Sequence, residues 1–509
     1  MSGAATTPTP DVNIPEPKIP EFRQFLGHPA PLWMLFMTEF WERFAFYGIR
    51  WALVLYIVTQ FHNGDPSGQQ PATLIYGSYL ALVYAGAVFG GYVADRVIGY
   101  QRSILVGASF MAAGLFAITI PNPDIFKLGL AAIIVGNGLF KPNISTMVGK
   151  LYAMGDTRRD SGFTIFYMGI NAGAFFAPIF TQILAQKVFN TGDMPAYKVV
   201  FFAAGIGMLI SLVWFAIGRR TLNGIGAPQG DAKSPARMLL VIVGGIVVIP
   251  LVYFLLRIGA GTLQYVLTAL FAVLAVMLMV EGIRDGKVAR DKTIAMMIIF
   301  AFNILFWMFF EQAGSSFTFL AENIVNRVGV FGMTEFPTAW FQSVNAIAII
   351  ACAPVVAWIW VVLARRNVNP SIPRKFGLGI LFNAAAFGLL MYALTFLIDS
   401  VGKIPFWTLF AVYVIQSVGE LCLSPIGLSM VTKLAPVRLV GLGMGGWFLS
   451  TGIGNNLSGI FASYVSGEKG MSVASALSGY TSGFWYLTIG GVILFLIAPL
   501  IQKLMHGVK

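Results

Sequence analysis

From residue 32 onward the chain alternates between long apolar segments and short polar ones. Segments of about 20 apolar residues can cross the hydrocarbon core of a bilayer as helices. No stretch has the regular alternation of apolar and polar positions that indicates strands of a membrane barrel. The pattern therefore predicts an all-α membrane protein with fourteen transmembrane helices, at residues 32–60, 72–97, 102–121, 126–150, 161–187, 198–218, 237–257, 262–283, 293–319, 338–364, 375–398, 405–432, 439–465 and 481–504.

These segments fall into groups of six, two and six. The sixth ends at Arg219-Arg220 and is followed by a Gly/Pro/Lys-rich stretch that is typical of a linker. The next two segments join at Gly259-Ala260-Gly261, contain almost no polar side chains, and are predicted to form a tight, lipid-facing hairpin. We therefore predict four parts: a cytoplasmic tail at 1–31, a six-helix bundle at 32–220, the linker and hairpin insertion at 221–292, and a second six-helix bundle at 293–509.

Composition and charge agree with this class. Only 11% of the residues are charged, whereas soluble domains have about 25%. The net charge of +12 is better explained by topology than by a nucleic acid partner, because most Lys and Arg residues fall in the tails and in every second loop. Basic loops stay in the cytoplasm, so both termini are predicted there. Residues 1–27 have no apolar core, so we expect a cytoplasmic tail there rather than a cleaved signal peptide.

Five charged side chains lie within the predicted spans. An ionised group near the bilayer centre costs roughly 2.5–3.5 kcal/mol on insertion scales, so five of them facing lipid would cost on the order of 10 kcal/mol or more. Such residues are retained when they face a bundle interior and carry ions or substrate. The sequence therefore predicts that the protein moves a charged solute, with candidate charges at Glu39, Glu42, Arg43, Lys141 and Glu311.

The charges also repeat along the two bundles. When the hairpin is left out of the count, the ionisable groups fall on the first, fourth, seventh and tenth helices. Equivalent helices of three-helix inverted repeats line one central site in many transporters. The site is therefore predicted to combine Glu39, Glu42, Arg43 and Arg50 with Lys141, Glu311 and Glu420.

The first of these helices carries a motif that can be compared with a known family. Glu39-x-x-Glu42-Arg43-Phe44-x-x-Tyr47 resembles the motif of the proton-dependent oligopeptide transporters, a branch of the major facilitator superfamily. Phe46 stands where that family usually has a tyrosine. Further segments resemble the family's other helices in the same order along the chain: Gly138-Leu-Phe-Lys141-Pro142-Asn143, Phe166-Tyr167-x-x-Ile170-Asn171-x-Gly173, Phe310-Glu311-Gln312-x-Gly314-Ser315, Trp340-Phe341-Gln342-Ser343-x-Asn345 and Gly419-Glu420-Leu421-x-x-Ser424-Pro425-x-Gly427.

This resemblance implies a major facilitator fold and proton-coupled symport of di- and tripeptides into the cell by alternating access. An extra helical pair is also seen in bacterial members of the family, and together with the compact loops it suggests a bacterial inner membrane. We expect the protein to function as a monomer. A same-fold transporter of another solute, such as nitrate or an amino-acid derivative, is the alternative. Glu420 favours a substrate with a positive amine.

A short peptide is a zwitterion, so its site must offer a cation, an anion and apolar volume. Arg50 and Lys141 are the candidate partners of the peptide carboxylate, since an arginine can bind a carboxylate through two hydrogen bonds. Glu420, assisted by Asn171 and Asn345, is the candidate partner of the ammonium group. The remaining candidate peptide-binding residues are Tyr47, Tyr84, Tyr167, Trp307, Ser424 and Trp447.

Proton coupling needs carboxylates that change protonation during the cycle, and burial and nearby cations act on them in opposite directions. We expect charged Glu42 to pair with Lys141 or Arg43, and its protonation to free a cation for the peptide. Glu39 belongs to the same cluster, and Glu311 is the candidate second proton site, linked to Arg50.

One further motif lies between the second and third predicted helices. It resembles the superfamily's loop motif, which implies a cytoplasmic gate, although simple loop packing is the alternative. Its residues are Gly91, Asp95, Arg96 and Gly99, and Gln101 replaces a usual basic residue.

The sequence carries no sign of a metal centre or of nucleotide use. Neither Cys352 nor Cys422 has a metal-ligand spacing, and the three histidines lie at helix ends or in tails. A phosphate-binding G-x-x-x-x-G-K-[ST] loop is absent from the sequence, so we expect an ion gradient rather than a cofactor to supply the energy. An enzyme or a channel is therefore the weaker interpretation.

Overall fold

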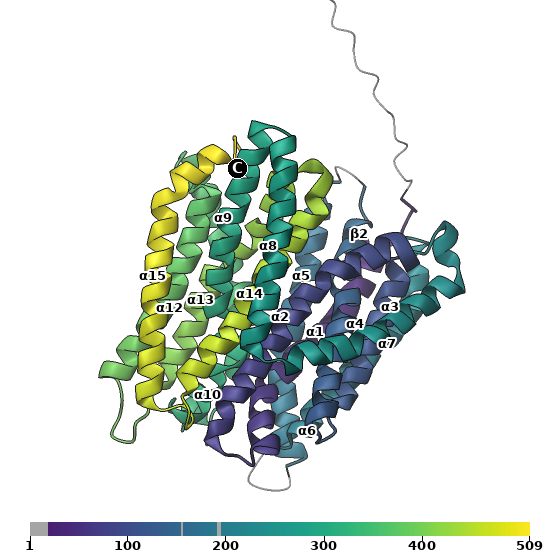
Figure 1. Ribbon diagram of the computed structural model, residues 1–509. Coiled ribbons are helices and arrows are strands. Elements are labelled where there is room, and N and C mark those ends of the chain that lie inside the picture. Colours follow the sequence, from purple (N-terminus) through teal and green to yellow (C-terminus); the bar gives the residue numbers. More distant parts are fainter. Residues whose placement is uncertain (1–18, 154–155, 191–194, 509) are drawn as a thin grey trace, which may run out of the picture.

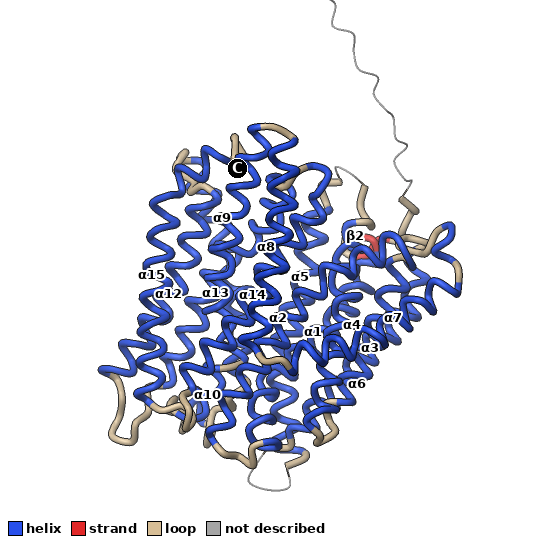
Figure 2. Tube along the Cα trace, viewed as in Figure 1, coloured by secondary structure: helices blue, strands red, loops and turns tan. Residues whose placement is uncertain are grey.

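The computed structural model describes residues 19–153, 156–190 and 195–508, and nearly all of its regular structure is helical (Figures 1 and 2). Residues 1–18 of the predicted tail lie outside the described residues. The rest of that tail forms a short antiparallel hairpin of β1 (Gln24–Phe25) and β2 (His28–Pro29) before the first helix begins at Ala30.

Fourteen long helices follow in the described part of the chain, one for each predicted apolar segment. The prediction of an all-α protein with fourteen long helices is therefore confirmed. The helices are α1 (Ala30–Tyr56), α2 (Gln69–Val93), α3 (Tyr100–Ala117), α4 (Pro123–Gly149), α5 (Arg159–Ile183), α6 (Tyr197–Gly218), α7 (Pro235–Arg257), α8 (Ala260–Arg284), α9 (Lys287–Phe310), α11 (Trp340–Arg365), α12 (Ile372–Phe396), α13 (Phe406–Leu434), α14 (Val440–Ser466) and α15 (Val473–Leu504), with the short α10 (Ser316–Asn323) after α9.

Twelve spans among the described residues are long and apolar enough to cross a membrane. The long helices outside that set are α3 and α14. Helix α14 is rich in Gly, Ser and Asn, and most of its side chains are buried against α2, α8 and α9. Because protein rather than lipid surrounds α14, it can carry polar side chains that a lipid-facing helix could not.

Helices α1–α6 pack mainly with one another, and α9–α15 do the same; we call these groups the first half and the second half. The halves meet along two pairs of helices, α2 with α14 and α5 with α11. Helices α2 and α14 cross very closely, because a Cβ on Gly77 would lie only 2.6 Å from Cα of Gly459. Small residues allow such close approach of helices in membranes.

The two inserted helices do not form the tight hairpin that the sequence suggested. Helix α7 packs against α4 of the first half, whereas α8 packs against α14 and α9 of the second half, and the two helices touch each other little. They diverge from their junction at Gly259, as Figure 1 shows. Both expose long rows of apolar side chains. A helix that is apolar all round can pack against either half, so its sequence does not identify its partner.

The ninth predicted segment, 293–319, is interrupted. Helix α9 ends at Phe310, a 3₁₀ turn η7 (Glu311–Gly314) follows, and α10 begins at Ser316. A side chain at position 314 is excluded, because a Cβ on Gly314 would lie 2.0 Å from the hydroxyl oxygen of Tyr76 in α2. The break brings Glu311 to the interface between the halves.

Both ends of the described chain lie at the same end of the molecule (Figure 1). We call the opposite end, where α2 begins and α5 ends, the far end. A cavity of about 450 Å³ lies there between the halves. Its lining includes Gln186 and Tyr197 of the first half and Glu322 and Pro337 of the second, and it contains none of the predicted site residues.

Candidate functional site

The charged stripe of α1 is buried as one cluster. The exposed fractions of Glu39, Glu42 and Arg43 are 3%, 0% and 3%. The guanidinium of Arg43 donates to both oxygens of Glu42, with a distance of 2.6 Å from Nη2 to Oε1, and its Nε lies 3.3 Å from Glu39 Oε1. Asn137 of α4 donates a further hydrogen bond to Glu42 Oε1 over 3.3 Å. The predicted pairing of Glu42 with a cation is thus made to Arg43.

Lys141 lies on α4 one helical turn after Asn137, but its ammonium group contacts an aromatic ring rather than a carboxylate. Its Nζ lies 4.4 Å from the centroid of the Tyr84 ring, which is a cation–π distance. Lys141 forms no ion pair within the described ranges of the chain. Its ammonium group is therefore held by a weak partner that a carboxylate could replace.

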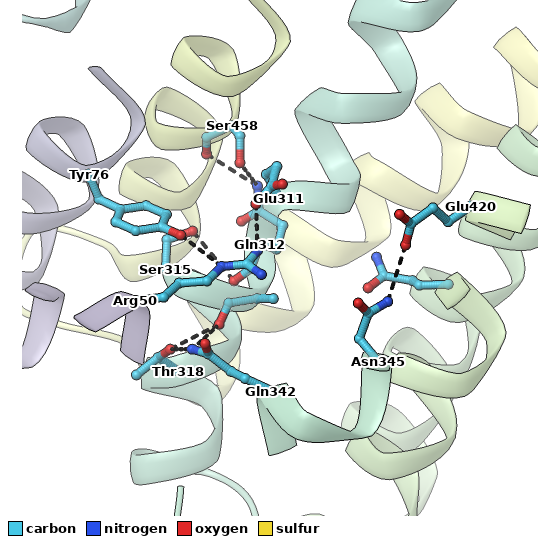
Figure 3. A network of polar contacts seen from close by, with 12 residues as sticks. Arg50, Tyr76, Glu311, Gln312, Ser315, Thr318, Gln342, Asn345, Glu420 and Ser458 are labelled. Carbon is cyan, nitrogen blue, oxygen red and sulfur yellow. Dashed lines mark hydrogen bonds and ion pairs between the residues drawn. The ribbon is translucent and has the colours of Figure 1, made fainter. Parts of the chain in front are cut away.

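Arg50 joins the two halves. Its Nη2 lies 2.5 Å from Glu311 Oε2, and its Nε donates to the Tyr76 hydroxyl over 2.9 Å (Figure 3). The Tyr47 ring lies beneath the guanidinium, with 5.7 Å to the centroid. Both charged side chains are about nine-tenths buried. The predicted link between Arg50 and Glu311 is therefore present, and it crosses from α1 to the break after α9.

The turn that carries Glu311 is itself held by amide side chains. Gln312 donates to the hydroxyl and the carbonyl of Ser458 in α14, over 2.9 and 3.2 Å, and accepts from Ser316 over 2.6 Å. Gln342 of α11 donates to the carbonyl of Ala313 over 3.0 Å. These contacts fix the backbone of η7 and so the direction of the Glu311 side chain; Figure 3 shows those between Gln312 and Ser458.

Glu420 on α13 forms a separate polar group. Asn345 of α11 donates to Glu420 Oε2 over 3.2 Å and to the Ser417 hydroxyl over 2.8 Å. Figure 3 shows this pair well apart from the Arg50 and Glu311 pair. No ion pair involving Glu420 occurs among the residues that the structure covers. The site therefore has cations on the first half and an amide-held carboxylate on the second.

The remaining predicted binding residues divide between the site and the packed interior. Tyr167 on α5 is 42% exposed, and the amide of Asn171 donates to its carbonyl over 2.9 Å within the same helix. The binding role of Asn171 stays a prediction. Trp307 donates to Asn303 over 3.0 Å. Two further residues lie nearer the core of the second half: Ser424, whose hydroxyl is buried, and Trp447, whose ring lies 6.2 Å from those of Phe300 and Phe376.

Comparison with known proteins identifies the family. A model described as the POT family matches residues 101–475 of the chain. Peptide transporter YePEPT of Yersinia enterocolitica is 36% identical to it, over 96% of this chain and 98% of its own length. This chain belongs to the POT family. Dipeptide and tripeptide permease B of Edwardsiella piscicida is 31% identical, over 94% of this chain and 97% of its own.

Solved POT structures share the whole arrangement of helices. The crystal structure of a peptide transporter POT in complex with sulfate has a TM-score of 0.81 and 34% identity, covering 95% of this chain and 97% of that chain. A mutant described under the same name was solved in complex with alafosfalin, with the same TM-score of 0.81. The fold is therefore the major facilitator fold of POT transporters, and the resemblance drawn from the motifs is confirmed.

The motif that resembles the superfamily's loop motif connects α2 to α3. It lies at the end of the molecule where both ends of the described chain are found. Asp95 and Arg96 are exposed, and Asp95 accepts a hydrogen bond from the Tyr100 hydroxyl. Gly99 has a φ of +80°, and a Cβ there would lie 2.9 Å from Pro228 of the linker. Gly91 has open space around it. The predicted gating role of these four residues stays a prediction.

Gln101 and Arg102, at the start of α3, bind the linker to the first half. Gln101 donates through its amide to the carbonyl of Ile225 over 2.8 Å, and Arg102 donates to the carbonyls of Ala232 and Lys233 over 2.8 and 3.0 Å. A neutral amide at position 101 suits this role because its partner is a carbonyl oxygen rather than an anion.

Two contributors to the POT site were missed by sequence reasoning. Asn137, which donates to Glu42, lies one helical turn before Lys141 on the same face of α4. Tyr76, which accepts from Arg50, lies about two turns before Tyr84 on α2. The spacing from an already chosen residue could have identified both.

Proposed function

We propose that this chain is a secondary active transporter that carries di- and tripeptides into the cell together with protons. Membership of the POT family supports this, as do relatives named peptide transporter and dipeptide and tripeptide permease. The peptide is moved without chemical conversion and without a cofactor. The proton gradient supplies the energy, and alternating access follows from rocking of the two halves about the site.

The observation that carries the proposal is the pair of incompletely matched charges on opposite halves. Lys141 rests on the Tyr84 ring, and Glu420 is held by the Asn345 amide. A peptide offers a carboxylate to the first and an ammonium group to the second. Charge-assisted hydrogen bonds to an ionised partner are about twice as strong as neutral ones, so a zwitterion improves both contacts.

Proton coupling would act through the two carboxylates that are paired with arginines. Protonation of Glu42 weakens its hold on Arg43, which frees a cation beside Lys141. Protonation of Glu311 weakens its ion pair with Arg50, which is one of the bonds between the halves. Protonation of these two carboxylates can therefore both release a cation for the peptide and weaken the contact between the halves.

The direct test is uptake of labelled dialanine into proteoliposomes with and without an inward proton gradient. Accumulation above the outside concentration, dependent on the gradient and inhibited by other di- and tripeptides, is the expected result. Gradient-driven proton entry with another solute but with no peptide would reassign the substrate.

The principal alternative substrate is an amino-acid derivative. One solved relative, at 29% identity and a TM-score of 0.78, is a POT family transporter in complex with 5-aminolevulinic acid. That molecule also carries an amine and a carboxylate, so Lys141 and Glu420 could serve it. Nitrate fits less well because it has no group for Glu420. Unlabelled 5-aminolevulinic acid and nitrate belong in the uptake test as competitors.

We further propose that the termini face the cytoplasm of a bacterial inner membrane and that the functional unit is a monomer. Bias of basic residues toward the terminal end supports the orientation. The bacterial source of the relatives supports the location. One chain supplies both a cation, Lys141, and an anion, Glu420, for a zwitterion, so the proposed site needs no second subunit.

A further inference from the structure

Two glutamines of the first half reach across to the second half at the far end. Oε1 of Gln182, at the end of α5, accepts the backbone N–H of Ala339 over 2.7 Å, immediately before α11. Oε1 of Gln69, the first residue of α2, accepts the backbone N–H of Met471 over 2.8 Å, shortly before α15. In both contacts a side-chain amide oxygen of one half binds a main-chain donor of the other.

The two contacts occupy equivalent positions in the fold. The halves meet along α2 with α14 and along α5 with α11. The Gln69 contact joins the start of α2 to the segment after α14, and the Gln182 contact joins the end of α5 to the start of α11. In each case the second helix of one half meets the end of the fifth helix of the other. The contacts therefore hold both edges of the interface between the halves.

Both hydrogen bonds are shielded from water. The exposed fractions are 5% for Gln69, 1% for Gln182, 0% for Ala339 and 8% for Met471. A buried N–H group that loses its acceptor is costly to the folded arrangement. Separation of the halves at the far end would expose all four groups to water, which satisfies them equally. The glutamine side chains therefore stabilise only the state that is closed at this end.

The structure around Ala339 makes its N–H depend on the other half. Ala339 is the N-cap residue of α11, and no side-chain cap bond is made within that helix. The N–H groups that begin a helix have no partner inside it. Gln182 supplies an acceptor here from α5. The helix start is thus completed only when the two halves are in contact.

We propose that Gln69 and Gln182 act as paired latches that close the far end and set the fraction of molecules closed there. This proposal rests on the proposed function, because transport requires the far end to open. A typical hydrogen bond contributes about 0.5–1.5 kcal/mol, so loss of one latch should raise the ratio of open to closed molecules about 2- to 12-fold. Loss of both should raise it further, because the two sites are separate.

The test measures the distance between the halves directly. Nitroxide labels are placed at Ile120→Cys and Val401→Cys, which are 45% and 75% exposed in far-end loops of the two halves. The background lacks Cys352 and Cys422. Pulsed electron spin resonance on the full-length protein in liposomes then gives the distance distribution for Gln69→Met, Gln182→Met and the double variant, since methionine keeps the side-chain length but offers no amide oxygen.

The expected result is growth of the longer-distance population in each methionine variant and more in the double variant. Gln502→Met is the matched control, because the Gln502 amide donates to Val508 within the second half, and its distribution should stay as in the parent. Unchanged distributions in both single variants, or an equal shift in the Gln502 control, would overturn the proposal.

A second variant tests the Gln182 bond from the donor side. Ala339 has a φ of −62°, which proline can adopt, so Ala339→Pro removes the N–H without changing this angle. If both substitutions act through one hydrogen bond, Gln182→Met should add little to Ala339→Pro. Full additivity would contradict the latch. None of these distance measurements requires a substrate. If the protein takes up no peptide but the distances change as expected, the proposed function is rejected and the latch proposal is retained.

Discussion

The guanidinium of Arg50 lies 2.5 Å from the carboxylate of Glu311, so a charge on the first helix of one half is neutralised by the turn that follows the first helix of the other. The pair is about nine-tenths buried, and the Tyr76 hydroxyl accepts a further hydrogen bond from Arg50. An ion pair in this position links the charge of the site to the contact between the halves. Substitutions at the pair should therefore affect stability as well as transport.

Glu311→Gln should lower the thermal unfolding midpoint of the purified protein. Removal of one partner of a buried ion pair leaves an uncompensated charge, at a typical cost of about 3–5 kcal/mol. The double variant Arg50→Gln with Glu311→Gln removes both charges and should recover part of the loss. Glu468→Gln, at an exposed position, is the control. A double variant no more stable than Glu311→Gln alone would contradict this account of the pair.

Glu42→Gln should abolish accumulation of dialanine driven by a proton gradient and leave exchange of peptide down its own gradient. Glutamine can still hydrogen-bond to Arg43 but cannot gain and lose a proton. Uptake and counterflow in the same proteoliposomes separate the two activities, with Glu468→Gln again as the control. Continued accumulation against a peptide gradient would show that Glu42 is not the coupling group.

Glu420→Gln should weaken binding of peptides that have a free amino terminus. Hydrogen bonds to charged groups contribute about 1.5–3 kcal/mol, which corresponds to roughly a 10- to 100-fold rise in KM for dialanine. N-acetyl-dialanine has no ammonium group, so its weaker competition should be little affected by the substitution. The measurement is inhibition of labelled dialanine uptake. An equal loss for both compounds would mean that Glu420 does not recognise the amine.

Lys141→Gln should have the complementary effect on the other end of the peptide. The ammonium of Lys141 has the Tyr84 ring as its partner and is free to accept a carboxylate. KM for dialanine should rise about 10- to 100-fold on the same reasoning, while dialanine amide, which lacks the carboxylate, should change little. Tyr84→Phe keeps the ring and should transport nearly as the parent does. A similar change for the acid and the amide would contradict the assignment.

The number and placement of the long helices could be predicted from sequence because a bilayer of fixed thickness requires apolar segments of a minimum length. The charged members of the site could be predicted because burying them in a membrane is costly, so each marks a function. Neutral partners such as Asn137 and Tyr76 gave no such signal, since a polar but uncharged side chain is tolerated at many positions in a helix.

Two features of the fold depend on contacts that are distant in sequence. The break after Phe310 has no proline to announce it and is matched to the Tyr76 hydroxyl beside Gly314. The divergence of α7 and α8 depends on which half each helix contacts. The ring of Trp447, a predicted binding residue, packs with Phe300 and Phe376, and its role in binding stays a prediction.

The divergence of α7 and α8 also determines where the chain could be divided. The linker is bound to α3 by Gln101 and Arg102, and α7 packs against α4, so both belong to the first half. Asn456 of α14 binds the carbonyl of Ala260 over 2.8 Å, which attaches α8 to the second half. The only covalent connection between the two described halves is therefore the short junction of α7 and α8 around Gly259. In two fragments produced separately and divided at that glycine, α7 would stay with α4 and α8 with α14, whereas a cut in the longer and more polar linker would separate α7 from α4.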